Sequence, residues 1–68
     1  DRYRLLRNAA EPLPANDRQI LELRHFDDMS NADCAEVLHI GPKAASIRYV
    51  RALQRLRKQL MELTEFQP

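Results

Sequence analysis

The second half of the sequence concentrates basic side chains, and they are its clearest candidates for binding chemistry. Residues 40–68 carry six basic and two acidic groups, a balance of +4, whereas residues 1–39 carry five basic and eight acidic groups, a balance of −3. Such asymmetry indicates a polyanionic partner on one side of the molecule. A merely solvated basic helix face is the alternative that charge alone leaves open. The six basic residues are Lys43, Arg48, Arg51, Arg55, Arg57 and Lys58.

Two apolar residues, Ile47 and Val50, stand among these charges. Helical spacing leaves them on the face opposite the apolar stripe, beside Lys43, Ser46 and Arg51. A solvated face does not need β-branched apolar side chains, whereas a face that enters a DNA groove or binds a partner can use them. Arginine can bind guanine through two hydrogen bonds, and an exposed Ile or Val can contact the methyl group of thymine.

Helices are expected to position these residues. Strand signals are almost absent, since strict alternation never runs long and no Asn-Gly or Asp-Gly hairpin turn occurs. Pro12 and Pro14 end a short first helix, and Ser30 is a good N-cap, with Asp33 completing a shortened capping box. The prediction is an all-α, small four-helix domain without a sheet, with a final segment TEFQP that frays. The predicted helices span residues 1–10, 15 or 16 to about 26, 31 to about 38, and 42 or 43 to about 63.

The predicted core follows the apolar positions of each helix. Ile40 is expected to fill the core between the last two helices, and the turn of His39, Ile40 and Gly41 is expected to separate them. The other predicted core residues are Leu13, Ile20, Leu21, Leu23, Phe26, Cys34, Ala35, Val37, Leu38, Ala45, Tyr49, Ala52, Leu53, Leu56, Leu60 and Leu63.

The last two helices match a helix-turn-helix over about residues 30–63. Ala35 is small where the first of these helices must approach the second, and Gly41-Pro42 is expected to end one helix and start the next. In such a motif the N-terminal residues of the second helix enter the DNA major groove, while lysine and arginine further along contact phosphates.

Other chemistries have little support. His25 and His39 lack the neighbours of a metal or catalytic site, and Cys34 lies on the apolar side of its helix. No cofactor, metal site or enzymatic activity is expected. The sequence has neither a long apolar run nor a signal-type N-terminus, so we expect a soluble, intracellular protein. The chain is interpreted as one domain over residues 1–68, a fragment of a longer protein.

The run from Leu13 to Leu60 resembles region 4 of the sigma-70 family of RNA polymerase sigma factors, particularly the extracytoplasmic-function (ECF) class. The family's Leu-Pro and R-x-(I/V)-L-x-L-R pattern corresponds to Leu13-Pro14 and to residues 18–24. Its Ser-capped helix is matched by Ser30, Asp33, Cys34 and Ala35, and its recognition helix by Arg48, Arg51, Ala52, Leu56 and Arg57.

The resemblance implies a winged-helix-like, sigma region 4 type of fold that recognises the −35 promoter element. It implies further partners, namely the flap of the RNA polymerase β-subunit and an anti-sigma factor. By this resemblance Arg51, Ser46 and Ile47 face bases and Arg48 faces a phosphate. Lys43 joins the base-facing set, and Arg55 and Lys58 join the phosphate set, because they extend the same helix face.

Two departures from the family pattern affect the reading of DNA. The usual Gly-Thr-Val at the start of the recognition helix is here Lys43-Ala44-Ala45, and the usual turn glycine is His39, where a left-handed backbone is mildly strained. Two alternatives remain open at this stage. The chain can be the helix-turn-helix effector domain of a response regulator, or a protein-interaction module bound by an anti-sigma factor.

Overall fold

The fold consists of four α-helices, one of which continues into a π-helical turn. The computed structural model describes the backbone of residues 2–65 and the side chains of residues 4–63. No strand occurs within this described part, so the predicted all-α class is confirmed. The elements are α1 (Arg2–Ala10), α2 (Ala15–Leu21), η1 (Glu22–Phe26), α3 (Asn31–Leu38) and α4 (Pro42–Glu65).

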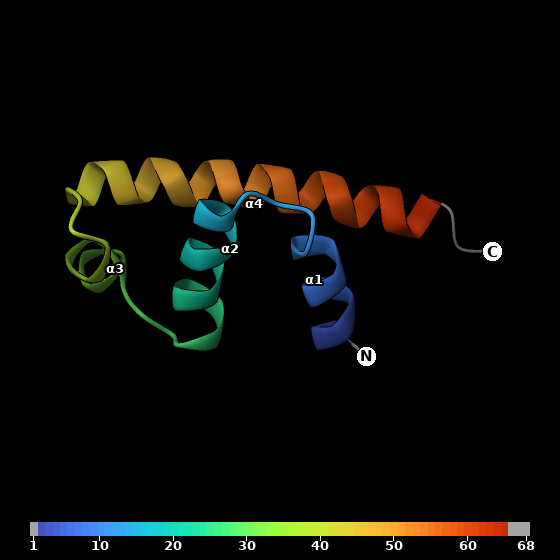
Figure 1. Ribbon diagram of the computed structural model, residues 1–68, viewed down its shortest axis with the longest axis horizontal. Helices are drawn as coiled ribbons and strands as arrows, with labels where there is room; N and C mark the ends of the chain where they lie inside the picture. Colours follow the sequence, from blue (N-terminus) through green and yellow to red (C-terminus); the bar gives the residue numbers. More distant parts are fainter. Residues whose placement is uncertain (1, 66–68) are drawn as a thin grey trace.

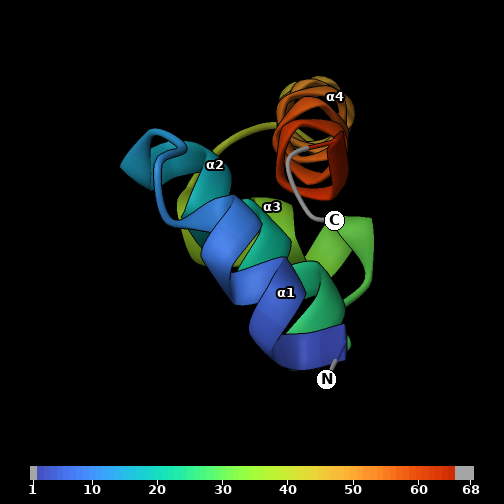
Figure 2. The same cartoon turned by 90° about the vertical axis from the view of Figure 1, so that its right-hand side faces the viewer.

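Helix α4 forms one side of the molecule, and the other three helices all pack against the same face of α4. It runs along the longest axis of a domain that measures 42 × 19 × 15 Å (Figure 1). The end-on view shows α1, α2 and α3 together on one side of α4 (Figure 2). One face of α4 is therefore left without a helical neighbour.

The core is small and is built mainly from short or medium-sized side chains. Ile20 and Cys34 are the largest side chains that are completely buried, and Leu21 and Leu13 lie beside them. The predicted stripe of α4 is confirmed, with three of its residues buried and the other four partly buried. The buried residues are Ala45, Ala52 and Leu56, and the partly buried ones are Tyr49, Leu53, Leu60 and Leu63.

Three core predictions need correction. Phe26 and Val37 are 45% and 49% exposed, and Ile40 is only half-buried. Phe26 ends the π-turn at the surface, where the guanidinium of Arg7 lies 5.9 Å from its ring centroid. Val37 lies on the outer side of α3, because that helix contacts its neighbours only through the side that carries Cys34 and Leu38.

The helix predicted to reach Phe26 does so with a change of type. After Leu21 the hydrogen bonds shift to the wider π pattern, which ends with the N–H of Asp27 donating to the carbonyl of Glu22 at 3.1 Å. Such turns are rare and occur often at functional sites. Here the turn presents Arg24 and His25 to α4, as described below.

The boundaries of the helix-turn-helix agree with the prediction, with one correction. Ser30 caps α3 by accepting a hydrogen bond from the N–H of Asp33 at 3.1 Å, and α4 starts at Pro42. His39, which occupies the position of the family's turn glycine, adopts the left-handed conformation with φ 56°. It is therefore His39, and not the expected Gly41-Pro42, that ends α3, and Gly41 has no positive φ. Helix α4 reaches Glu65, beyond the predicted Leu63; Asp1 and residues 66–68 of the tail predicted to fray lie outside the described residues.

Candidate nucleic-acid interface

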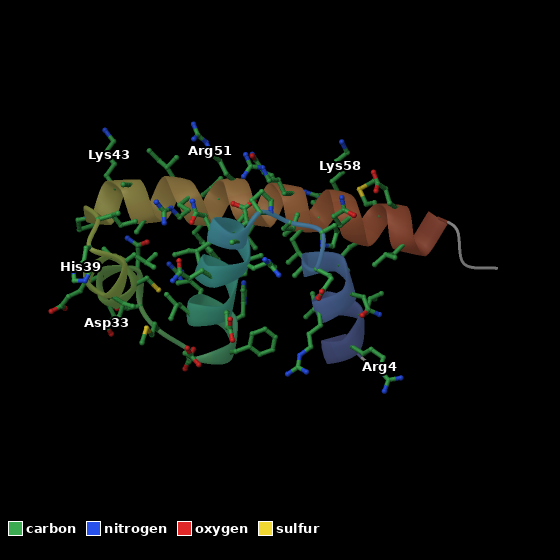
Figure 3. The ribbon with its side chains drawn as sticks, viewed as in Figure 1. Arg4, Asp33, His39, Lys43, Arg51 and Lys58 are labelled. Atoms are coloured by element: carbon green, nitrogen blue, oxygen red, sulfur yellow. The ribbon has the colours of Figure 1, made fainter. Side chains whose placement is uncertain are left out.

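The uncovered face of α4 carries all four residues predicted to face bases. Lys43, Ser46, Ile47 and Arg51 are exposed. Lys43, Arg51 and Lys58 point away from the other three helices in the side-chain view (Figure 3). They share one face because seven or eight residues make about two turns of an α-helix. The structure thus aligns a basic strip along some four turns of α4.

Apolar side chains interrupt this strip without being buried by the domain. Ile47 is 44% exposed and Val50 is 49% exposed. Both lie with Ser46, Arg51 and Gln54 around a shallow hollow on the outer face of α4. The face therefore offers methyl groups and hydrogen-bond donors side by side, and both kinds of group can contact base edges in a major groove.

A second hollow, of about 450 Å³, lies where the start of α2 meets α4. It brings together four predicted site residues from α4, and α2 and the segment before it supply the other wall. Its lining is Pro14, Asn16, Asp17, Ala44, Ile47, Arg48, Arg51 and Arg55. Of the seven predicted site residues, Lys43, Ser46 and Lys58 do not line this hollow.

Arg55 has a partner that the sequence did not indicate. Its Nη1 donates to Oδ2 of Asp17 at 2.7 Å, and the carboxylate side chain is only 4% exposed whereas the arginine side chain is 51% exposed. The contact fastens α2 to the middle of α4. About half of the Arg55 side chain is exposed to solvent, but its positive charge is partly balanced by Asp17 inside the domain.

Tyr49 is held on two sides by residues of η1. The guanidinium of Arg24 lies 4.2 Å from the tyrosine ring centroid, close enough for a cation–π contact. The tyrosine hydroxyl and Nε2 of His25 are 3.0 Å apart in a hydrogen bond. His25, for which the sequence indicated no metal or catalytic role, thus makes a specific contact that fixes η1 to α4 one helical turn after Ala45.

Asn31 joins the beginning of α3 to the beginning of α4. Its Nδ2 donates to the carbonyl oxygen of Pro42 at 2.9 Å, and its Oδ1 accepts from Nη1 of Arg24 at 3.4 Å. The sequence did not indicate these contacts of Asp17, Arg24 and Asn31, because their partners are 7 to 38 residues away. For Asp17 and Asn31 the signal was a polar residue in the first turn of a helix, which predicts a cap as readily as a contact with another helix.

The described residues offer no group of three or more His, Cys, Asp or Glu side chains that could hold a metal ion. Cys34 is a free, buried thiol. No helix in the described part of the chain has the length and apolar character needed to cross a membrane. The arrangement that stands out is therefore the basic and apolar face of α4.

Comparison with known families supports this picture. The family described as "Sigma-70, region 4" matches residues 3–56, which include nearly all of α1, all of α2, η1 and α3, and α4 as far as Leu56. Comparisons with curated proteins and with solved structures find no significant match. The chain belongs to the sigma-70 region 4 family, whose members are DNA-binding, non-catalytic domains that take part in promoter recognition and interact with the RNA polymerase core.

Proposed function

We propose that the chain recognises the −35 promoter element as region 4 of an ECF-type sigma factor, with α4 as the recognition helix. The observation that carries this proposal is the uncovered face of α4, where exposed Ile47 and Val50 lie among basic side chains. The family match favours this function over the effector domain of a response regulator. The site of action is the bacterial cytoplasm, on promoter DNA.

Four residues are assigned to base contacts. Arg51 is the strongest candidate for guanine, because a guanidinium matches the O6 and N7 acceptors of that base. Ile47 supplies methyl groups for a thymine, and Ser46 supplies a hydroxyl group that can donate or accept. Lys43 stands at the start of the helix, where the family pattern has no charge, and it adds a donor that reaches a further base.

Three residues are assigned to phosphates. Arg48 and Arg55 line the hollow between α2 and α4, where a DNA backbone can approach. Lys58 lies further along the same face as Lys43 and Arg51 (Figure 3). Up to Met61, helix α4 has no acidic side chain that would repel phosphates. These contacts contribute affinity and register rather than sequence preference.

The proposed protein partners are the flap of the polymerase β-subunit and an anti-sigma factor. Exposed Ile47 and Val50 also suit an apolar partner, so a protein-interaction module bound by an anti-sigma factor is the second candidate function. A phosphate-dominated complex weakens steeply as ionic strength rises, whereas an apolar protein interface hardly responds.

The test is selection of a randomised duplex library with the chain, followed by titration of the selected and a scrambled duplex at several salt concentrations. We expect a preferred sequence and a negative slope of log K against log salt of several units, since each phosphate contact contributes about 0.9. Equal binding of both duplexes would refute sequence-specific recognition. A salt-independent association with a partner protein, without DNA binding, would favour the interaction module.

A further inference from the structure

The first turn of α4 has few attachments to the rest of the domain. Lys43 and Ala44 are exposed, and Ala45 is the buried residue of this turn. Pro42 has no N–H, and Gly41 before it has no side chain, with no heavy atom within 4 Å of the position that a Cβ would occupy. Side-chain packing therefore holds this turn through a single small residue, Ala45.

The hydrogen bond from Asn31 supplies a second attachment. Its amide donates to the carbonyl of Pro42 at 2.9 Å, 11 residues away, and so ties the start of α3 to the start of α4. The amide oxygen accepts from Arg24 at 3.4 Å, and Arg24 lies against Tyr49. The orientation of the Asn31 amide is therefore fixed from η1, and a fixed amide holds Pro42 at a defined place.

The later turns of α4 are held by different groups. Arg24 and His25 contact Tyr49, and Asp17 pairs with Arg55. These contacts flank Arg51, which lies between Tyr49 and Arg55 in the sequence. The Asn31 bond consequently acts on the part of the helix that carries Lys43 and Ser46, and much less on the part that carries Arg51.

We propose that Asn31 is a positioning residue for DNA recognition: its bond to Pro42 sets where the first turn of α4 lies, and thereby which bases Lys43 and Ser46 contact. This inference rests on the proposed function, because it assumes that these two side chains face bases. It adds a residue that does not touch DNA itself but determines sequence preference at one end of the site.

The variant Asn31→Asp separates the effects of the two hydrogen bonds of Asn31, one to the Pro42 carbonyl and one from Arg24. Aspartate has the shape of asparagine and can still accept from Arg24, but an ionised carboxylate cannot donate to the Pro42 carbonyl. Its added negative charge weakens binding to all duplexes alike, so the informative quantity is the preference between bases at each position. Asn31→Ala, which removes both halves, serves as a second variant.

Ser30→Ala is the matched control. Ser30 neighbours Asn31 and caps α3 through the N–H of Asp33, so its loss destabilises the same helix end while leaving the Asn31–Pro42 bond in place. If Asn31 affected DNA binding only through the stability of the domain, Ser30→Ala would change the base preference in the same way as the Asn31 variants. Circular dichroism of each variant of the chain confirms that it is folded at the temperature of the binding experiment.

The experiment is selection from a randomised duplex library with the wild-type chain and the three variants, with Lys43→Ala, Ser46→Ala and Arg51→Ala identifying the position that each side chain contacts. We expect both Asn31 variants to lower the base preference about threefold to tenfold at the positions that Lys43 and Ser46 contact, because a displaced first turn misaligns the donors of these side chains. The base preference at the position that Arg51 contacts should stay within about twofold of wild type. Ser30→Ala should retain the wild-type preference throughout.

The possible failures are distinct. A wild-type chain without any base preference would overturn the proposed function, and this inference with it. A wild-type preference that Asn31→Asp and Asn31→Ala leave unchanged would overturn the inference alone. The same applies to a loss spread equally over all positions, since that result indicates general loosening of the domain rather than placement of the first turn.

Discussion

Arg55 and Asp17, 38 residues apart in the sequence, form an ion pair in which Nη1 and Oδ2 are separated by 2.7 Å. The pair is unequal, because the carboxylate is 4% exposed and the arginine side chain is 51% exposed. Arg55 supplies the counter-charge that contacts this buried carboxylate within the described part of the chain, whereas the exposed arginine can also be hydrated. This asymmetry has consequences for both stability and DNA binding.

Loss of Arg55 should destabilise the domain more than loss of Asp17. Arg55→Ala leaves a buried carboxylate unpaired, which costs about 1–3 kcal/mol. Asp17→Ala leaves an arginine that water can solvate, so the cost is about 1 kcal/mol, including the favourable position of an acid in the first turn of α2. Urea unfolding followed by circular dichroism measures both values.

Arg57→Ala is the matched control for that comparison, since Arg57 is an exposed residue of the same helix. Its free energy of unfolding should stay within about 0.5 kcal/mol of wild type, as for most surface substitutions. A larger loss for Asp17→Ala than for Arg55→Ala would contradict the asymmetric account of the pair.

Arg51 and Lys58 should differ in their effect on DNA recognition. Arg51→Ala is expected to cost about 1–3 kcal/mol on the preferred duplex and to relax one base position, whereas Lys58→Ala should weaken all duplexes alike and reduce the salt slope by about one. Titration of the selected and scrambled duplexes at several salt concentrations separates these outcomes. Equal losses on both duplexes for Arg51→Ala would remove it from the base-facing set.

The fold was largely predictable because its signals are local. The Ser30 cap, the start of α4 at Pro42 and the apolar stripe through Ala45, Ala52 and Leu56 depend on residues close in sequence, and all are found in the structure. Exposure of Phe26 was not predictable, because it depends on a change from α to π hydrogen bonding that has no known local signature here.

The candidate interface was predictable only in part. The uncovered face of α4 follows from helical periodicity, so the exposure of Lys43, Ile47 and Arg51 agrees with the sequence. The groups that hold this helix in place could not be predicted in the same way, because Asp17 and Asn31 contact partners that only the packing of the helices brings near. Sequence patterns identify a surface more readily than the polar contacts that orient it.

Tyr49 should stabilise the packing of η1 against α4 through two contacts that can be removed separately. Tyr49→Phe removes the hydrogen bond to His25, an exposed contact worth about 0.5–1 kcal/mol, and keeps the ring under Arg24. Tyr49→Leu also removes the cation–π contact, for a further loss of about 0.5–1 kcal/mol. Urea unfolding measures the free energy of unfolding of both variants, and Tyr49→Leu should lose more than Tyr49→Phe. Equal losses would show that the cation–π contact with Arg24 contributes nothing.

The turn before α4 can be made more stable by moving its glycine. His39 has φ 56°, a left-handed conformation that costs a non-glycine residue about 1–2 kcal/mol. His39→Gly should therefore raise the free energy of unfolding by about 0.5–1 kcal/mol. This value is the relieved strain minus the larger conformational entropy that glycine loses on folding. Gly41 lacks a positive φ and has open space around it. Gly41→Ser should add about 0.4–1 kcal/mol by restricting the unfolded chain.

The control for this pair is His39→Ala, which keeps a Cβ at the left-handed position and should therefore give little or no stabilisation. Thermal unfolding by circular dichroism measures all three variants, and a gain of 1 kcal/mol in so small a domain raises Tm by about 4–8 °C. If His39→Ala were as stable as His39→Gly, relief of backbone strain would not be the cause, and the imidazole itself would be the destabilising group. If Gly41→Ser were destabilising, the hydroxymethyl group would have to disturb the start of α4, against the open space found around Gly41.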